Sequence, residues 1–216
     1  PRGGIYLFPM IIYDGMLKYA NFSPDILQNI ENRIGLQLQD VEDEERKENG
    51  FLAIDLIDYI YAVLHSVTYR DTYHDFLQND FPTIPYPASA EYFFKMAEFG
   101  KRLRYLHELK GIDRKDLITT YPVIGEKDNN VVLIHKFEET NEGIGRVWIN
   151  KEQYFDGVPL EAWNMIIAGY QPLEKWLKDR KDKHLTSDEI IHYQKMVVAL
   201  VKTIRTQEKI DEIIEL

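Results

Sequence analysis

The sequence lacks cysteine entirely, and this absence excludes disulfide bonds, a thiol nucleophile and a cysteine-based zinc site. It also lacks any apolar run close to the roughly 20 residues that a membrane-spanning helix needs, and no segment has the pattern of a secretory signal peptide. We therefore expect a protein of a reducing cytoplasm that has no membrane partner. Because the chain begins with Pro1 instead of methionine, we also expect it to be part of a longer polypeptide.

The motifs of several enzyme classes are missing too. Methyl transfer to a base amino group requires an (N/D)PP(Y/F) loop and a glycine-rich cofactor turn, a P-loop requires GxxxxGK[ST], and the sequence has none of these. One pattern resembles a nuclease metal site, with Asp25 followed by Glu45 and Lys47. Such a site needs both acids around one metal ion, whereas Asp25 begins a predicted helix and Glu45 lies in an acidic loop. We therefore expect a non-catalytic chain that holds no metal or cofactor.

Positive charge is scarce overall, since 26 Lys and Arg face 36 Asp and Glu and give a formal net charge of -10. This total argues against non-specific binding of polyanions by the whole surface. The charge is unevenly spread, however. Residues 40–48 carry six acids and two bases, whereas residues 101–115 carry six bases and two acids. A basic face can therefore exist on this acidic chain.

The hydrophobic pattern predicts an α+β fold, mostly helical with one small antiparallel sheet. We expect a helical part over about 20–111, a strand-rich part over about 112–158 and C-terminal helices over 159–216. Ser23-Pro24-Asp25 is typical of a helix start, and Thr186 to Glu189 form a capping box. Strands are predicted over residues 5–13, 131–137 and 146–149. A turn is predicted between the last two strands, over residues 141–145.

The segment from Pro172 to Asp182 has the most closely spaced cations. On a helix with 100° per residue, one stripe is apolar, formed by Leu173, Trp176 and Leu177. The opposite face carries both signs of charge. It offers three i,i+4 ion pairs, Glu174/Lys178, Lys175/Asp179 and Lys178/Asp182. Most of these lysines are therefore neutralised locally.

Arg180 differs from these lysines because it falls within the apolar stripe. Burying an unpaired guanidinium there would cost a large amount of free energy. Either the helix ends before Arg180, or its side chain reaches past the edge of the core to an anion. Arg180, Lys181 and Lys183 then form a compact basic turn with only Asp182 beside it. No acidic partner is evident in the sequence for Arg180 or Lys181.

Several long segments resemble a known family: LIDYIYAVLHSVTYR (56–70), DFPTIPYP (80–87), GRVWINKEQYFDGVP (145–159) and GYQPLEKWLKDRK (169–181). Over nearly the whole chain, the sequence resembles the C-terminal specificity domain of Type ISP restriction-modification enzymes and of the related single-chain Type IIG enzymes. Ala168 stands where relatives often have a second glycine. The resemblance implies a target recognition domain over 1–216 that acts in the bacterial cytoplasm.

The resemblance also implies partners in the same polypeptide. The domain would position an adjoining adenine methyltransferase domain, linked to a motor and a nuclease, on a short asymmetric DNA site. S-adenosylmethionine, ATP and Mg²⁺ would be bound by those other modules, with no cofactor in this chain.

We accordingly predict sequence-specific binding of double-stranded DNA in the major groove. Contacts to the DNA backbone are predicted for Lys175, Lys178, Arg180 and Lys181, and base contacts for Asn150, Lys151, Gln153 and Tyr170. Arg146 is ambiguous, because on a strand it can pair with Glu138 or Glu139. The alternative is a structural docking module whose basic segment binds an acidic surface of its methyltransferase domain without reading bases.

Overall fold

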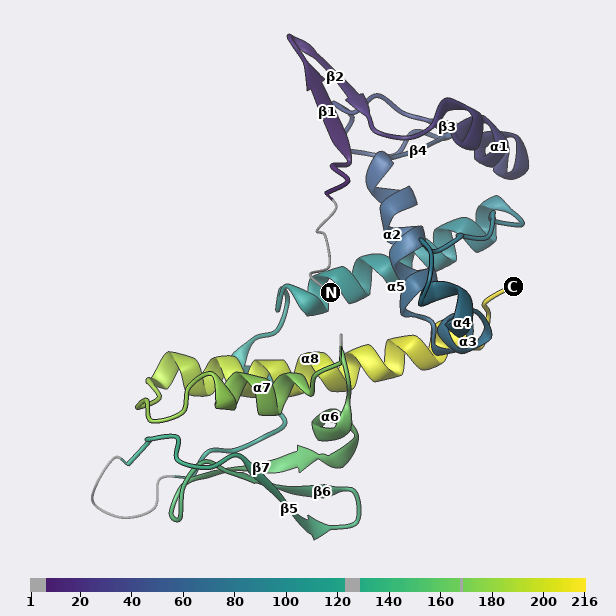
Figure 1. Cartoon of the computed structure of the whole chain (residues 1–216). Coiled ribbons are helices and arrows are strands. Elements are labelled where there is room, and N and C mark those ends of the chain that lie inside the picture. Colours follow the sequence, from purple (N-terminus) through teal and green to yellow (C-terminus); the bar gives the residue numbers. More distant parts are fainter. Residues whose placement is uncertain (1–6, 123–128, 168) are drawn as a thin grey trace. The chain divides into compact units, whose positions relative to one another are not determined.

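The computed structural model describes residues 7–122, 129–167 and 169–216. Helices account for 45% of the described residues and strands for 17%, which confirms the α+β, mostly helical class (Figure 1). Where the sequence predicted one small sheet, the described residues form three: β1-β2, β3-β4 and β5-β6-β7. Among the described residues, no helix combines the length and apolar character that crossing a bilayer requires.

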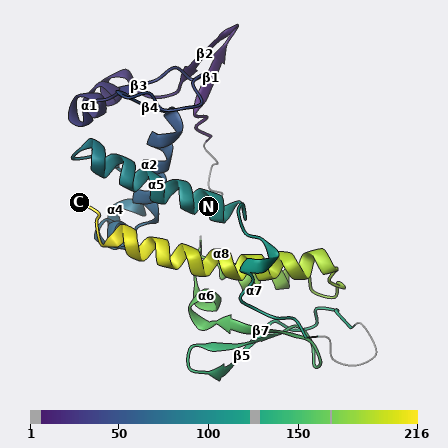
Figure 2. The same ribbon diagram turned by 180° about the vertical axis from the view of Figure 1, so that it is seen from behind.

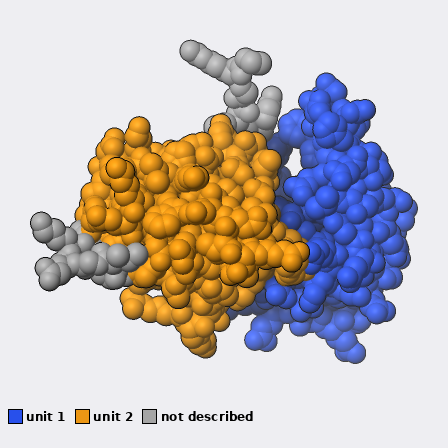
Figure 3. All heavy atoms as spheres, turned by 90° about the horizontal axis from the view of Figure 1, so that it is seen from below, with its two compact units in different colours: residues 1–104, 206–216 blue, residues 105–205 orange. Residues whose placement is uncertain are grey.

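The chain divides into two compact units, coloured separately in Figure 3. Unit 1 comprises residues 1–104 and 206–216, and unit 2 comprises residues 105–205. The sequence-based division into three parts differs from this one in two ways. The C-terminal helices share unit 2 with the strands, and the last helix, α8 (Ser187–Asp211), ends in unit 1.

Unit 1 begins with an antiparallel hairpin of β1 (Ile11–Asp14) and β2 (Leu17–Ala20). Two residues each from β3 (Gln37–Leu38) and β4 (Gly50–Phe51) then pair in parallel. Its helices are α1 (Pro24–Ile34), α2 (Ala53–His65), α3 (Val67–Thr72), α4 (His74–Leu77) and most of α5 (Ala90–His107). Their apolar faces form one core that includes Phe51, Tyr59, Phe93 and Met96.

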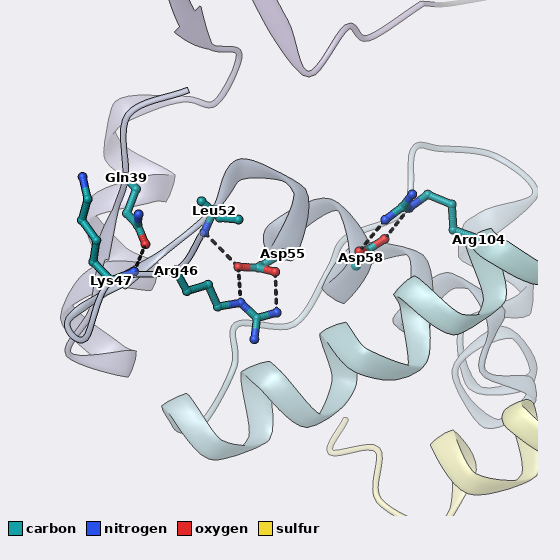
Figure 4. A network of polar contacts seen from close by, with 7 residues as sticks. All are labelled: Gln39, Arg46, Lys47, Leu52, Asp55, Asp58 and Arg104. Atoms are coloured by element: carbon teal, nitrogen blue, oxygen red, sulfur yellow. Dashed lines mark hydrogen bonds and ion pairs between the residues drawn. The ribbon is translucent and has the colours of Figure 1, made fainter. Parts of the chain in front are cut away.

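The crossing of α2 and α5 depends on a glycine and on buried ion pairs. A Cβ on Gly100 would lie 1.7 Å from the Asp58 carbonyl oxygen, so no other residue fits this crossing. The buried Asp58 carboxylate accepts two hydrogen bonds from Arg104, at 2.8 and 3.0 Å, and Asp55 accepts two from Arg46 (Figure 4). These arginines are therefore used to neutralise acids inside the unit.

Unit 2 contains a three-stranded antiparallel sheet with the order β5 (Lys136–Asn141), β6 (Ile144–Trp148) and β7 (Tyr154–Pro159). A 3₁₀ turn, η1 (Arg114–Asp116), and two short helices, α6 (Leu160–Asn164) and α7 (Pro172–Lys178), join most of α8 in this unit. One face of the sheet packs on α7 and α8. That core includes Val147, Phe155, Leu173, Leu177 and Tyr193.

Several predicted boundaries need correction. The first predicted strand covers 5–13, whereas β1 is Ile11–Asp14 and residues 1–6 lie outside the described range. The strand predicted over 131–137 is wrong in position, because β5 starts at Lys136. The helix α3 is capped by the hydroxyl of Ser66, which accepts from the amide of Tyr69.

Helix starts were predicted more accurately. Pro24 begins α1, and Gly35 ends it in the left-handed conformation. The Ser89 hydroxyl accepts a hydrogen bond from the amide of Tyr92 at the start of α5. Thr186 and Glu189 exchange hydrogen bonds at the start of α8, which confirms the capping box.

Candidate nucleic-acid interface

Three short segments of unit 2 meet beside the sheet. We call residues 129–134 the connecting segment, 149–153 the sheet turn and 180–183 the basic turn. On one side, the connecting segment binds the end of β6, where the Ile149 carbonyl accepts from Leu133 at 2.7 Å. On the other side, Val132 donates to Lys183 at 3.0 Å and accepts from Asp182 at 2.8 Å. The structure therefore brings together two groups of residues that the sequence analysis selected separately.

Asn150 fixes the shape of the sheet turn. Its side chain is 2% exposed and donates to the carbonyls of Asn129 and Val131 at 2.8 and 3.0 Å. It also accepts from the amides of Glu152 and Gln153 at 2.9 and 2.8 Å. The base contact predicted for Asn150 is therefore not available in this conformation, because every donor and acceptor of this amide is used to join the turn to the connecting segment.

Gln153, for which a base contact was also predicted, is buried as well, at 1% exposure. Its backbone amide is held by Asn150 and its carbonyl accepts from Ile149. Both polar atoms of its side chain lack a hydrogen-bond partner among the residues that the structure describes. In this conformation the side chain is closed off from any base edge.

Three lysines of these turns remain exposed: Lys151 in the sheet turn, and Lys181 and Lys183 in the basic turn. Within the described ranges 7–122, 129–167 and 169–216, none of the three has a carboxylate at ion-pair distance. The backbone near all three is fixed by the hydrogen bonds of the connecting segment. The two turns therefore present unneutralised positive charge from a rigid base.

Arg180 is engaged inside the protein, so the expectation that it lacks a partner is wrong. The helix α7 ends at Lys178, and the Nε of Arg180 donates to Glu189 at 3.0 Å. Its guanidinium also lies 3.6 Å from the centre of the Trp176 ring, a favourable cation–π geometry. Arg180 thereby fixes the basic turn to the start of α8.

The pKa directions agree with this arrangement. The pKa of the Glu189 carboxyl is lowered, first by its hydrogen bond from the Thr186 backbone and also by Arg180. His192, one turn further along α8, stacks on Trp176. Burial, and then the charge of Arg180, lower the pKa of His192. Both carboxylate and neutral imidazole are therefore the favoured forms near neutral pH.

The lysines of α7 are paired as the sequence predicted. Lys178 lies 2.8 Å from Glu174, and Lys175 donates to Asp179 at 2.6 Å. The third predicted pair does not continue this series, since Asp182 lies beyond the helix end with a φ of 63°. The two helix lysines are exposed but locally neutralised.

Arg146 lies on β6 and pairs across the sheet with Asp156, at 3.0 Å, and not with Glu138 or Glu139. Its guanidinium is 4.6 Å from the ring centre of Tyr154. Tyr154 is itself a buried residue of β7. Arg146 is therefore part of the outward face of the sheet.

Tyr170 lies in a tight turn before α7. The amides and carbonyls of Ile167 and Tyr170 bond reciprocally at 2.8 and 3.0 Å, and Gly169 adopts a φ of +83° that favours glycine. The Tyr170 side chain is 60% exposed. Its ring is thus accessible to a partner, unlike those of most other aromatics in unit 2.

The pattern that resembled a nuclease site forms no metal centre. Asp25 lies in the first turn of α1, and Glu45 is an exposed loop residue whose backbone carbonyl accepts from Gln39. Among the described residues, no group of three or more histidine, aspartate or glutamate side chains is arranged to hold a metal ion.

Sequence reasoning missed the connecting segment as the link between the two turns. The only local signal is Asp128-Asn129-Asn130, a composition typical of a turn, of which Asp128 lies outside the described residues. The pairing of Val131 with His184 joins positions 53 residues apart. Such a long-range contact leaves no periodic signal in one sequence.

Comparisons with known proteins place this architecture in a family. The family model of the Type ISP C-terminal specificity domain matches residues 2–216, and no curated protein matches. A DrdV-DNA complex has a similar fold, with a TM-score of 0.65 and 18% identity over 95% of this chain. The ATP-dependent Type ISP restriction-modification enzyme LlaBIII bound to DNA also has a similar fold, with a TM-score of 0.59 and 19% identity over 93% of this chain.

The chain spans only 21% and 12% of those two solved chains. The match to the family model, in contrast, extends over almost every residue of both units. The chain belongs to the family of Type ISP C-terminal specificity domains.

Proposed function

We propose that this domain recognises a specific sequence in double-stranded DNA, through the major groove, for an adjoining adenine methyltransferase domain of the same polypeptide. The observation that carries the proposal is the pair of rigid turns that display Lys151, Lys181 and Lys183 without neutralising acids in the described chain. Membership of a specificity-domain family supports target recognition as the purpose of this charge. The solved relatives with this fold were determined in complex with DNA.

The contacts divide by chemistry. Lys181 and Lys183 suit the phosphate backbone, since their charge is exposed and their positions are fixed by the connecting segment. Lys151 suits the acceptor atoms of guanine in the major groove, and the exposed Tyr170 ring suits stacking or apolar contact. Lys175 and Lys178 contribute less, because each already has a carboxylate partner.

Three of the sequence-predicted residues take supporting roles in this proposal. Asn150 shapes the sheet turn, Arg180 anchors the basic turn and Arg146 stabilises the sheet face. Gln153 would contact a base only after its side chain leaves the core. Base reading thus falls to residues that Asn150, Arg180 and Arg146 hold in place.

We further propose that catalysis lies outside this chain. S-adenosylmethionine, ATP and Mg²⁺ would be bound by other domains of the parent enzyme, and the described residues offer no metal-binding cluster. The docking alternative assigned the basic segment to an acidic methyltransferase surface. It is not favoured, because the family is defined by specificity.

The test uses the full-length enzyme, whose cognate site is first found by sequencing the methylated positions in a host that carries it. Lys151→Ala should weaken binding to the cognate duplex by roughly 1–3 kcal/mol and binding to a scrambled duplex much less. Lys136→Ala is the matched control, since it also removes an exposed lysine from this unit. Equal losses of Lys151→Ala on both duplexes would contradict base reading by Lys151.

A further inference from the structure

The β1–β2 hairpin of unit 1 exposes large apolar side chains. Met16 is 99% exposed, Leu17 70% and Tyr13 67%. Figures 1 and 2 both show the two strands extending away from α1 and α2 of the same unit. Single exposed apolar residues are ordinary, but several at the tip of one hairpin, on both of its faces, mark an interaction surface.

The strand register leaves the hairpin without a core of its own. Tyr13 faces Lys18 and Asp14 faces Leu17, so each side of the ribbon combines one exposed apolar residue with one charge. A two-stranded hairpin alone is only marginally stable in water. Its base is closed by the amide of Asn21, which donates to the carbonyl of Met10 at 2.8 Å. The tip, in contrast, has no covering element among the described residues.

A small hollow beside the hairpin base has acidic side chains in its lining. It measures about 270 Å³, and its lining combines apolar Met10, Ile11 and Ile54 with acidic Asp40, Asp43 and Glu44. This volume accommodates one or two side chains of a partner. The acidic residues of the lining favour a cation, whereas its apolar residues favour an aliphatic stem, and lysine and arginine side chains combine both.

The cations near this hollow are already neutralised. Lys18 pairs with Glu42, Lys47 with Asp43, and Arg46 with the buried Asp55. Glu44 and Glu48 have no cationic partner in the part of the chain that the structure describes. The local charge of residues 40–48 is therefore negative in the folded protein as in the sequence, and it repels phosphate.

We propose that the hairpin tip and the acidic hollow form a docking surface for a protein surface whose apolar side chains are edged by lysine and arginine. The structure assigns this surface to a neighbouring domain of the full-length enzyme, because the family is a C-terminal domain and the solved relatives have much longer chains. This surface has the opposite charge to the two turns of unit 2. The proposal does not depend on which residues read DNA.

The experiment is hydrogen exchange of the β1–β2 amides, measured on the full-length enzyme without DNA and on the isolated domain. Docking should slow exchange of the hairpin amides by about tenfold or more in the full-length enzyme, at every protein concentration. Equal rates in both proteins would overturn the proposal. Slowing only after duplex DNA is added would assign the hairpin to DNA, and slowing that grows with concentration would assign it to a second copy.

Two variants complete the test. Met16→Ser combined with Leu17→Ser should restore fast exchange in the full-length enzyme while leaving the melting temperature of the isolated domain unchanged, since both side chains are already in water. Glu44→Lys should accelerate exchange as well, because it replaces a favourable charge by a repulsive one. Protection that survives both variants would overturn the proposal. If the wild-type full-length enzyme did not bind its cognate duplex in preference to a scrambled one while its hairpin amides stayed protected, only the proposed function would be contradicted.

Discussion

The arginines of unit 1 and the lysines of unit 2 have the same charge and opposite surroundings. Arg46 and Arg104 are bonded to aspartates that are 6% and 2% exposed, whereas Lys181 and Lys183 are exposed beside a fixed backbone. Arg104 belongs to the most basic stretch of the sequence, residues 101–115. The number of cations in a segment therefore does not locate an interface. An interface is indicated by cations that have no neutralising acid inside the fold.

The largest expected effect comes from breaking a buried pair. Asp58→Ala removes the carboxylate that accepts two hydrogen bonds from Arg104. We expect the free energy of unfolding to fall by about 3–5 kcal/mol, the usual cost of losing one partner of a buried pair. Urea denaturation measures it, with Lys181→Ala as the control that changes stability by less than about 0.5 kcal/mol. Similar losses in both variants would remove the distinction between the two regions.

Asn150→Ala should have the next largest effect. It leaves the amides of Glu152 and Gln153 and two carbonyls of the connecting segment without their partner. We expect a loss of roughly 2–4 kcal/mol of stability, with DNA affinity per folded molecule little changed. A selective loss on the cognate duplex in a variant that melts like the wild type would restore the base contact predicted from the sequence.

The fold was predictable where the signal was local. Helix starts at Pro24 and Ser187 follow from capping residues, and the ion pairs of α7 follow from i,i+4 spacing. The site was predictable only in part. Lys151 and Lys181 are accessible, but Asn150 and Arg180 are occupied by the backbone of Asn129 and by the Glu189 carboxylate. Those partners lie 9 or more residues away, beyond the reach of periodicity.

A smaller, pH-dependent effect is expected for Arg180→Ala. At neutral pH it should cost about 1 kcal/mol, because the pair with Glu189 is only partly buried. The pKa of Glu189 is lowered, so its contribution is lost as the pH falls through its titration range. The pKa of His192 is lowered by burial and then by Arg180, so the wild type also loses stability as the pH falls below the ordinary histidine value.

Protonation of Glu189 and protonation of His192 both destabilise the wild type in acid. In the variant, the part of each effect that is due to Arg180 is absent. Thermal melts at several pH values should therefore show that the difference between wild type and Arg180→Ala narrows as the pH is lowered. A difference that widens in acid would mean that Arg180 does not act through Glu189 and His192. Arg205→Ala is a suitable control, because its pair with Glu161 lies away from both groups.

The most direct test of the central claim is the salt dependence of DNA binding by the full-length enzyme. Lys181→Ala combined with Lys183→Ala removes two unneutralised cations, whereas Lys175→Ala combined with Lys178→Ala removes two that are paired. The account predicts that the first double variant flattens the slope of log affinity against log salt by about one to two units on cognate and scrambled duplexes alike. It predicts a clearly smaller change for the second. Equal changes in the two variants, or none in the first, would contradict it.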